Sequence, residues 1–208
     1  MSQNKNAQPG RPRLSAALIL SLALLVGGLG ILAAVIHFTM PRGGQTASSP
    51  SAIGGAFNLV DQNGKPVTEK DLTGKPSLVF FGFTHCPDIC PTKLFEITQM
   101  LDSLGADAGR VNVVFITVDP ERDTTELLST YLGSFHAGIR GLTGSEQQVT
   151  QAMRAYRAFA RKVPLDAGGY TMDHTTFVYL MDRNGQFVST FDVTRDPARA
   201  AQDLRRFM

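Results

Sequence analysis

The chain has 208 residues, of which 43% are hydrophobic and 18% are charged, and its formal net charge is +2. This length suits one globular domain with a buried core plus an additional apolar segment. The small net charge and the lack of a basic block argue against nucleic acid as a partner, and two cysteines are too few for a disulfide scaffold.

The N-terminal part of the chain has the pattern of a membrane anchor. Residues 1–13 are polar and basic, and residues 14–36 contain no charged side chain. An uncharged stretch of this length can cross a bilayer, whereas the apolar core of a cleaved signal peptide is usually about 7–15 residues. We therefore predict one retained transmembrane helix over residues 14–38, with residues 1–13 in the cytoplasm by the positive-inside rule.

The rest of the chain is then expected on the far side of that membrane. A short polar N-terminus fits a bacterial inner membrane, with the domain in the periplasm, better than a mitochondrial transit peptide. Residues 39–56 are rich in Gly, Ser and Pro, which predicts a flexible linker. Residues 57–208 are expected to form the soluble domain.

The soluble domain is predicted to open with a hairpin, because residues 57–60 and 65–68 flank an Asn-Gly turn. Residues 77–83 form an almost continuous apolar run, typical of a strand buried on both faces of a sheet. An amphipathic helix is predicted over residues 92–104, and Gly105 would end it.

The remaining sequence alternates between strand and helix patterns. The predicted strands are residues 111–118, 139–142, 175–181 and 187–193. The predicted helices are residues 123–132, capped by Asp123, residues 145–161, and a last one opened by Asp196 and Pro197. Residues 163–172 contain two adjacent glycines and are expected to be a loop. The order predicts an α/β protein with a mixed central sheet, in the outline of a thioredoxin-like fold.

The two cysteines, Cys86 and Cys90, lie where the strand over residues 77–83 ends and a helix begins. Sites in open α/β sheets form at the carboxyl ends of strands, and a helix N-terminus favours the thiolate. Thiolates are soft ligands that select Cu(I), zinc or iron–sulfur clusters, and two of them need a third ligand from elsewhere. Outside the cytoplasm, a structural disulfide is the simplest alternative.

Imidazole suits both copper and zinc, and the chain has four histidines. His37 lies at the predicted membrane exit, His85 is expected to point away from the cysteines, and His136 lies in a loop-like stretch. His174 lies where a loop enters a strand that would face the cysteines, although a buried structural histidine is the alternative. Asp173 could orient that imidazole or be a plain loop residue.

Asp119 follows the second buried strand, at the same edge of the predicted sheet as the cysteines. Together with its neighbours Glu121, Arg122 and Asp123, it could support the metal loop or dock a partner. A simple strand end before a capped helix explains it equally well.

Three segments of the chain resemble the signature blocks of the Sco/SenC family. They are residues 83–91 (FTHCPDICP), residues 118–123 (VDPERD) and residues 173–175 (DHT). The resemblance extends over about residues 57–206, with the blocks in the family's order and spacing. It implies a membrane-anchored, thioredoxin-like copper protein that helps to assemble the copper centre of cytochrome c oxidase.

By that resemblance the copper ligands are Cys86, Cys90 and His174, and the ion is Cu(I) or Cu(II). The expected partners are the copper-receiving subunit of cytochrome c oxidase, an upstream copper donor and a thiol reductant. The protein would be primarily a metallochaperone. A chaperone must release its metal, and an exposed site with few ligands allows that.

Other readings of the same thiols remain open. A thiol–disulfide oxidoreductase would use Cys86 and Cys90 with the same fold, and this activity could coexist with copper delivery. A peroxiredoxin-type peroxidase fits less well, because Val79 and Phe83 stand where its motif has Pro and Thr. A redox sensor or an inert domain with a structural disulfide is the remaining alternative.

Overall fold

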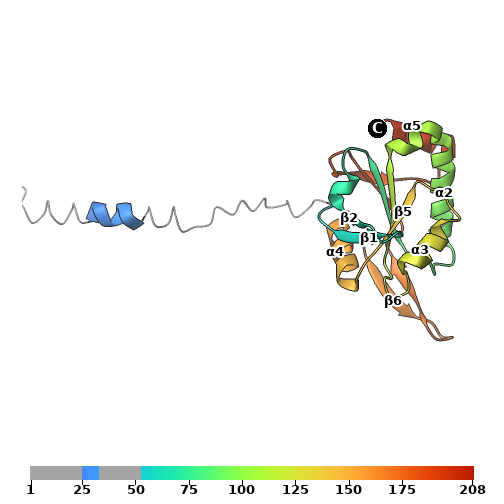
Figure 1. Cartoon of the computed structure of the whole chain (residues 1–208), viewed down its shortest axis with the longest axis horizontal. Coiled ribbons are helices and arrows are strands. Elements are labelled where there is room, and N and C mark those ends of the chain that lie inside the picture. Colours follow the sequence, from blue (N-terminus) through green and yellow to red (C-terminus); the bar gives the residue numbers. More distant parts are fainter. Residues whose placement is uncertain (1–24, 33–52) are drawn as a thin grey trace, which may run out of the picture. The chain divides into compact units, whose positions relative to one another are not determined.

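The computed structural model describes residues 25–32 and 53–208 (Figure 1). Residues 25–32 are helical and exposed, and no helix in these described parts is long and apolar enough to cross a membrane. The predicted N-terminus (1–13) and most of the predicted anchor (14–38) and linker (39–56) lie outside the described residues.

Seven strands form one mixed sheet, as the sequence predicts, in the order β2-β1-β5-β4-β3-β8-β9. β3, β4 and β5 are parallel, and β1 and β8 join them in antiparallel fashion. The strands are β1 (Asn58–Asp61), β2 (Pro66–Thr68), β3 (Ser77–Gly82), β4 (Asn112–Thr117), β5 (Ile139–Thr143), β8 (Val178–Met181) and β9 (Phe187–Phe191). All six residues of β3 are buried, which explains its continuous apolar run.

Helices cover both faces of this sheet. The helices are α2 (Ile89–Leu104), α3 (Thr125–Leu132), α4 (Glu146–Tyr156) and α5 (Pro197–Arg205), with short 3-10 helices η1 (Glu69–Leu72) and η2 (Gly105–Arg110). Successive residues of a strand point to opposite faces. Gly82 of β3 faces Cys90 of α2, and Phe81 packs on Tyr156 of α4, so α2 and α4 lie on opposite faces.

Aromatic and aliphatic side chains fill the core on both faces of β3. Phe80 and Phe115 pack together on the α2 face, with ring centroids 5.8 Å apart. On the α4 face, Phe81 contacts Tyr156 and Tyr179 at 5.6 and 5.9 Å. Burying one such side chain contributes about 1.5–3 kcal/mol. The core therefore holds β3 rigidly, which fixes the position at which the segment after β3 begins.

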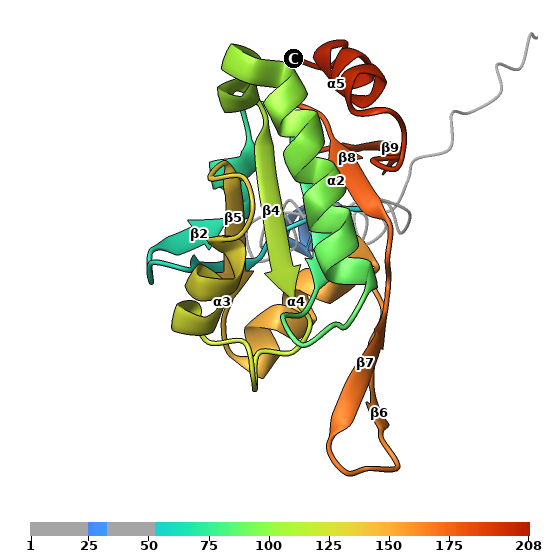
Figure 2. The ribbon, with the colours of Figure 1, turned by 90° about the vertical axis from the view of Figure 1, so that its right-hand side faces the viewer.

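The predicted loop over residues 163–172 is wrong, because this part of the chain forms a second, two-stranded sheet. β6 (Ala160–Pro164) pairs antiparallel with β7 (Tyr170–His174). Gly168 and Gly169, with φ of +87° and +79°, allow the chain to reverse between them. Figure 2 shows this β6–β7 hairpin projecting from the end of the sheet opposite α5, where the arrowhead of β4 also lies.

The predicted helix over residues 145–161 is too long. α4 ends at Tyr156, because Arg157 adopts the left-handed conformation (φ +52°) that ends helices. Its predicted start is confirmed, since Ser145 and Gln148 form a reciprocal capping box. The helix opened by Asp196 and Pro197 is also confirmed.

Three further boundaries differ from the prediction. α2 begins at Ile89, so Cys90 lies inside the helix rather than before it. β8 begins at Val178 instead of residue 175. Asp123 does not cap α3, since Thr124 takes that position and accepts from the Leu127 N–H at 3.2 Å. The carboxylate of Asp123 is thereby free for other partners.

Candidate metal centre

Cys86 and Cys90 lie on the segment that joins β3 to α2. The N–H of Cys86 donates to the Phe83 carbonyl at 3.2 Å, which turns the chain directly after the strand. Cys90 is the second residue of α2, and its N–H donates to Sγ of Cys86 at 3.3 Å. That bond holds the Cys86 sulfur at the first turn of α2.

Gly82 makes room for the Cys90 side chain. A Cβ at this position would lie 2.8 Å from Sγ of Cys90 and 2.6 Å from the Phe115 ring. Cys90 is thus fully buried against the sheet, whereas Cys86 is only partly buried. Burial raises the pKa of the Cys90 thiol, so this side chain is neutral until a metal or another reaction takes its proton.

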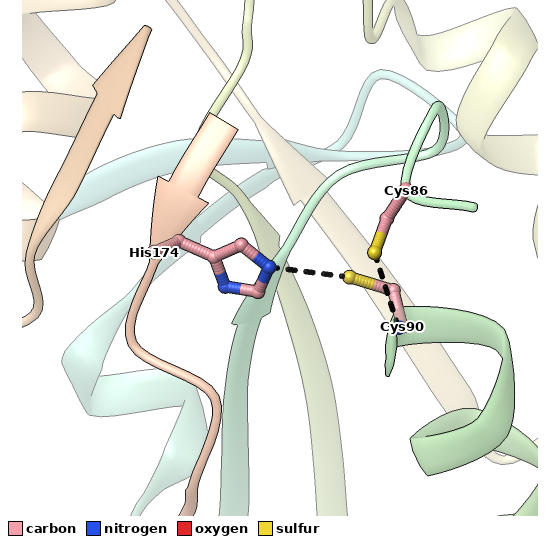
Figure 3. A group of neighbouring side chains, drawn as sticks. All are labelled: Cys86, Cys90 and His174. Carbon is pink, nitrogen blue, oxygen red and sulfur yellow. Dashed lines mark hydrogen bonds between the residues drawn. The ribbon is translucent and has the colours of Figure 1, made fainter. Parts of the chain in front are cut away.

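His174 is the last residue of β7, and its ring points at the cysteines (Figure 3). Its Nδ1 lies 2.8 Å from the Thr175 carbonyl oxygen, which can only accept, so this contact favours the tautomer with the proton on Nδ1. In that tautomer Nε2 presents its lone pair, and it lies 3.6 Å from Sγ of Cys90. This is the arrangement expected of a metal-ligating histidine.

The ligand atoms of Cys86, Cys90 and His174 all lie within 4.8 Å of one another. Sulfur and nitrogen ligands bind a transition metal at about 2.0–2.3 Å, so three of them around one ion are roughly 3.5–4 Å apart. Small side-chain adjustments are enough to reach that spacing. The structure thus brings together the three predicted ligands, which the chain separates by up to 88 positions.

The other histidines lie elsewhere. His85 is half exposed, and its Nδ1 lies 3.0 Å from Oγ1 of Thr84. Nδ1 of His136 accepts from the Gly138 N–H at 2.9 Å in an exposed turn. His37 is outside the described residues.

Asp173 does not hold the imidazole. Its carboxylate pairs with Arg161 on the neighbouring strand at 2.6 Å, and both side chains are more than half exposed. The Thr175 carbonyl takes the orienting role for which Asp173 was considered. The Arg161–Asp173 ion pair joins the two strands of the hairpin on its solvent side, where such pairs contribute little stability.

Asp119 and Asp123 are both buried beside the centre. Asp119 accepts from the Tyr170 hydroxyl at 2.9 Å, and Asp123 accepts from the Thr84 hydroxyl at 2.6 Å. From the sequence, Asp119 and its neighbours, Asp123 among them, are a candidate surface for supporting the metal loop, and Asp123 is also expected to cap a helix. No local pattern reveals the Asp123 contact, because Thr84 lies 39 residues away in the chain.

Comparisons with known proteins agree on one family. The sequence model of the SCO1/SenC family matches residues 45–208. The chain is 38% identical over 192 residues to an SCO2-like protein of Rickettsia felis, covering 90% of this chain and 94% of the relative. It is 40% identical over 162 residues to the human mitochondrial SCO2 homologue, covering 76% of this chain and 61% of the relative.

Solved structures give the same result. ScoI of Bradyrhizobium japonicum with copper bound is 55% identical and superposes with a TM-score of 0.74, covering 76% of this chain and 100% of the other. Yeast Sco1 with copper bound is 39% identical, with a TM-score of 0.68 over 74% of this chain and 87% of the other. Both relatives hold copper, and this chain has a Cys–Cys–His group placed to bind a metal.

Proposed function

Because this chain belongs to the SCO1/SenC family, we propose that it binds copper and delivers it to cytochrome c oxidase during assembly of that enzyme. The observation that supports this most strongly is the convergence of two thiols and one imidazole within 4.8 Å at one edge of the sheet. The ligands are Cys86, Cys90 and His174.

The chemistry of these donors suits copper. Two thiolates match the soft Cu(I) ion, and an imidazole with an additional ligand lets the same site take Cu(II). Binding displaces the proton of the buried Cys90 thiol, so copper affinity falls in acid. Each cysteine that is a thiol releases its proton when its sulfur binds the metal ion, and no redox state changes.

Release is the second requirement of a copper chaperone. A site with three protein ligands leaves a coordination position open, whereas four closed ligands would make a structural metal site. Cys86 is partly exposed, so a cysteine or histidine of the acceptor can approach the metal beside it. Copper then passes by stepwise ligand exchange to the copper-receiving subunit of the oxidase.

The proposed setting is the bacterial inner membrane. The uncharged stretch within residues 14–38 would be a single transmembrane anchor, residues 39–56 a linker, and residues 57–208 a periplasmic domain. Reporter fusions test this placement. Alkaline phosphatase fused after residue 50 should be active and a fluorescent protein that folds only in the cytoplasm should be dark, and the reverse pattern would exclude the orientation.

An anaerobic Cu(I) titration tests the copper proposal. Residues 53–208 lie in one compact unit, and a fragment from residue 48 onward should bind about one Cu(I) when reduced. Cys86→Ser and Cys90→Ser should abolish tight binding, while Cys90→Ser retains thiol titration at Cys86. Failure of the reduced wild-type fragment to bind Cu(I) would favour the second candidate function.

That second candidate is thiol–disulfide exchange, which the two free and neighbouring thiols favour. The Cys86 thiolate would attack a partner's disulfide and release one partner thiolate. Cys90 would then resolve the mixed disulfide, so that this chain is oxidised by two electrons and the partner is reduced. An upstream thiol reductant would restore the pair. His174→Ala should leave this exchange intact, which separates it from copper binding.

A further inference from the structure

Residues 119–123, here called the anchor turn, contact both segments that hold the proposed copper ligands. The turn follows β4, and the N–H groups of Arg122 and Asp123 donate to the Asp119 carbonyl at 3.2 and 2.9 Å. The side chains of Asp119 and Asp123 are fully buried. A buried carboxylate is costly unless it is hydrogen-bonded, so its partners indicate what the turn holds in place.

Asp123 holds the segment that carries the cysteines. Its Oδ2 accepts from the Thr84 N–H at 3.0 Å and from the Thr117 hydroxyl at 2.6 Å. Its Oδ1 accepts from the Thr84 hydroxyl at 2.6 Å. Thr84 lies two residues before Cys86, so these bonds fix the chain immediately ahead of the first thiol.

Asp119 and Arg122 hold the β6–β7 hairpin. The Tyr170 hydroxyl donates to Oδ1 of Asp119 at 2.9 Å, Arg122 Nε donates to Oδ2, and Arg122 Nη1 donates to the Tyr170 carbonyl at 3.0 Å. The guanidinium carbon also lies 3.9 Å from the Tyr170 ring centroid, at cation–π distance. Tyr170 begins β7 and His174 ends it, and residues four apart in a strand face the same side.

Arg122 also reaches His174 through Phe83. Its guanidinium carbon lies 5.8 Å from the Phe83 ring centroid, and Phe83 meets the His174 ring edge-on with centroids 5.6 Å apart. Arg122 Nη2 is buried without a hydrogen-bond partner among the described residues. A buried donor without a hydrogen-bond partner lowers the stability of the fold. Such a loss of stability is expected where a residue is placed for function rather than for stability alone.

We propose that the anchor turn positions the two halves of the copper site separately, with Asp123 setting the cysteines and the Asp119–Arg122–Tyr170 contact setting His174. This inference rests on the proposed copper-binding function and adds the residues that organise the site. Asp119, Arg122, Tyr170 and Asp123 are positioning residues, because they touch the ligand-bearing segments and not the metal.

The two halves have different consequences for the two copper ions. Cu(I) is held by the soft thiolates, whereas Cu(II) prefers a tetragonal set of ligands and depends more on the imidazole. Loosening the hairpin contact should therefore weaken Cu(II) binding and leave Cu(I) binding nearly unchanged. Loosening the Asp123 contact should weaken both, because it moves the thiols.

Three variants of the full-length protein, purified in detergent, test the assignment. Tyr170→Phe removes only the hydroxyl bond to Asp119 and keeps the ring. It should lower Cu(II) affinity at least roughly tenfold and alter the thiolate-to-Cu(II) absorption band, with Cu(I) affinity within about threefold of wild type. Arg122→Lys should give the same pattern, while Thr84→Val should lower the affinity for both Cu(I) and Cu(II).

Metal-free protein gives a second readout. The amides of the β6–β7 hairpin should exchange with solvent roughly tenfold faster in Tyr170→Phe. Tyr156→Phe is the matched control, because its ring packs on the opposite face of β3 and its hydroxyl makes no hydrogen bond within residues 53–208. It should change neither the copper affinities nor the exchange of the hairpin.

Two results would overturn the proposal. One is a Tyr170→Phe protein whose Cu(II) affinity and spectrum match wild type. The other is an equal loss of Cu(I) and Cu(II) affinity in that variant, which would mean that the hairpin contact does not act through His174. If wild type itself binds neither ion, the proposed function fails instead. The amide exchange rates of the β6–β7 hairpin still show whether the anchor turn holds that hairpin in place.

Discussion

Nε2 of His174 lies 3.6 Å from Sγ of Cys90, although 84 residues separate them in the chain. The contact joins the end of the β6–β7 hairpin to the first turn of α2. Neither residue is positioned by its chain neighbours alone. The fold of the domain brings them together. A change in the position of β3, α2 or the β6–β7 hairpin should therefore alter the geometry of the metal centre.

The close packing of Gly82 against Cys90 gives the first prediction. In Gly82→Ala the added methyl group would meet Cys90 Sγ and the Phe115 ring at under 3 Å. Overpacking of this kind costs about 1–3 kcal/mol of unfolding free energy, and displacement of the thiol should also weaken Cu(I) binding. Urea unfolding of the metal-free protein measures the stability change.

Gly109→Ala is the matched control for that substitution. A Cβ at Gly109 meets no atom within 4 Å, and its φ is not positive. Its stability and Cu(I) affinity should therefore match wild type. Equal stability of Gly82→Ala and Gly109→Ala would show that the sheet can yield around Cys90.

The second prediction concerns linkage between copper and folding. A ligand that binds only the native state raises stability by RT ln(1 + [L]/Kd), about 4 kcal/mol at a thousandfold excess over Kd. Free Cu(I) held at a fixed level by a competing chelator should raise the unfolding midpoint of wild type. Cys90→Ser should show no such rise, and a rise as large as in wild type would remove Cys90 from the ligand set.

The third prediction is a pH effect on the docking of α5. Hydrogen bonds from Arg110 and Arg205 lower the pKa of Asp107, and the Arg205 contact joins α5 to η2. The ionised Asp107 stabilises the fold fully when the pH is above its pKa in the unfolded state, near 3.8. This contribution is lost as the pH falls through the lower pKa of Asp107 in the folded state. Wild type should therefore lose stability as the pH falls below the unfolded value of 3.8.

Asp107→Asn tests this assignment. It should be less stable than wild type at pH 6, by an amount that shrinks in high salt because the carboxylate is partly exposed. The difference in stability should narrow as the pH falls below 3.8. A constant difference across this pH range would show that ionisation of Asp107 does not stabilise the fold.

The strongly patterned parts of the domain could be predicted from the sequence. The apolar run over residues 77–83 identified β3, because a strand buried on both faces needs no polar side chains. Ser145 with Gln148, and Asp196 with Pro197, marked two helix starts, because capping is a local interaction. Two thiols at the end of a buried strand likewise indicated a metal or redox site.

The hairpin that carries His174 could not be predicted in the same way. Most side chains of β6 and β7 are exposed or partly exposed, so no buried face imposes a regular alternation. The length of α4 was overestimated because the left-handed conformation of Arg157 has no glycine to signal it. The capping role expected of Asp123 is wrong, and its actual contacts could not be predicted, because its partners Thr84 and Thr117 come from other parts of the fold.

X-ray absorption at the copper edge of the reduced, Cu(I)-loaded protein measures which atoms bind the metal. We expect two sulfur scatterers at about 2.2–2.3 Å and one nitrogen at about 2.0 Å, with the nitrogen lost in His174→Ala and one sulfur lost in Cys86→Ser or Cys90→Ser. A His174→Ala spectrum identical to wild type, or a wild-type copper ion without sulfur ligands, would contradict a centre built from Cys86, Cys90 and His174.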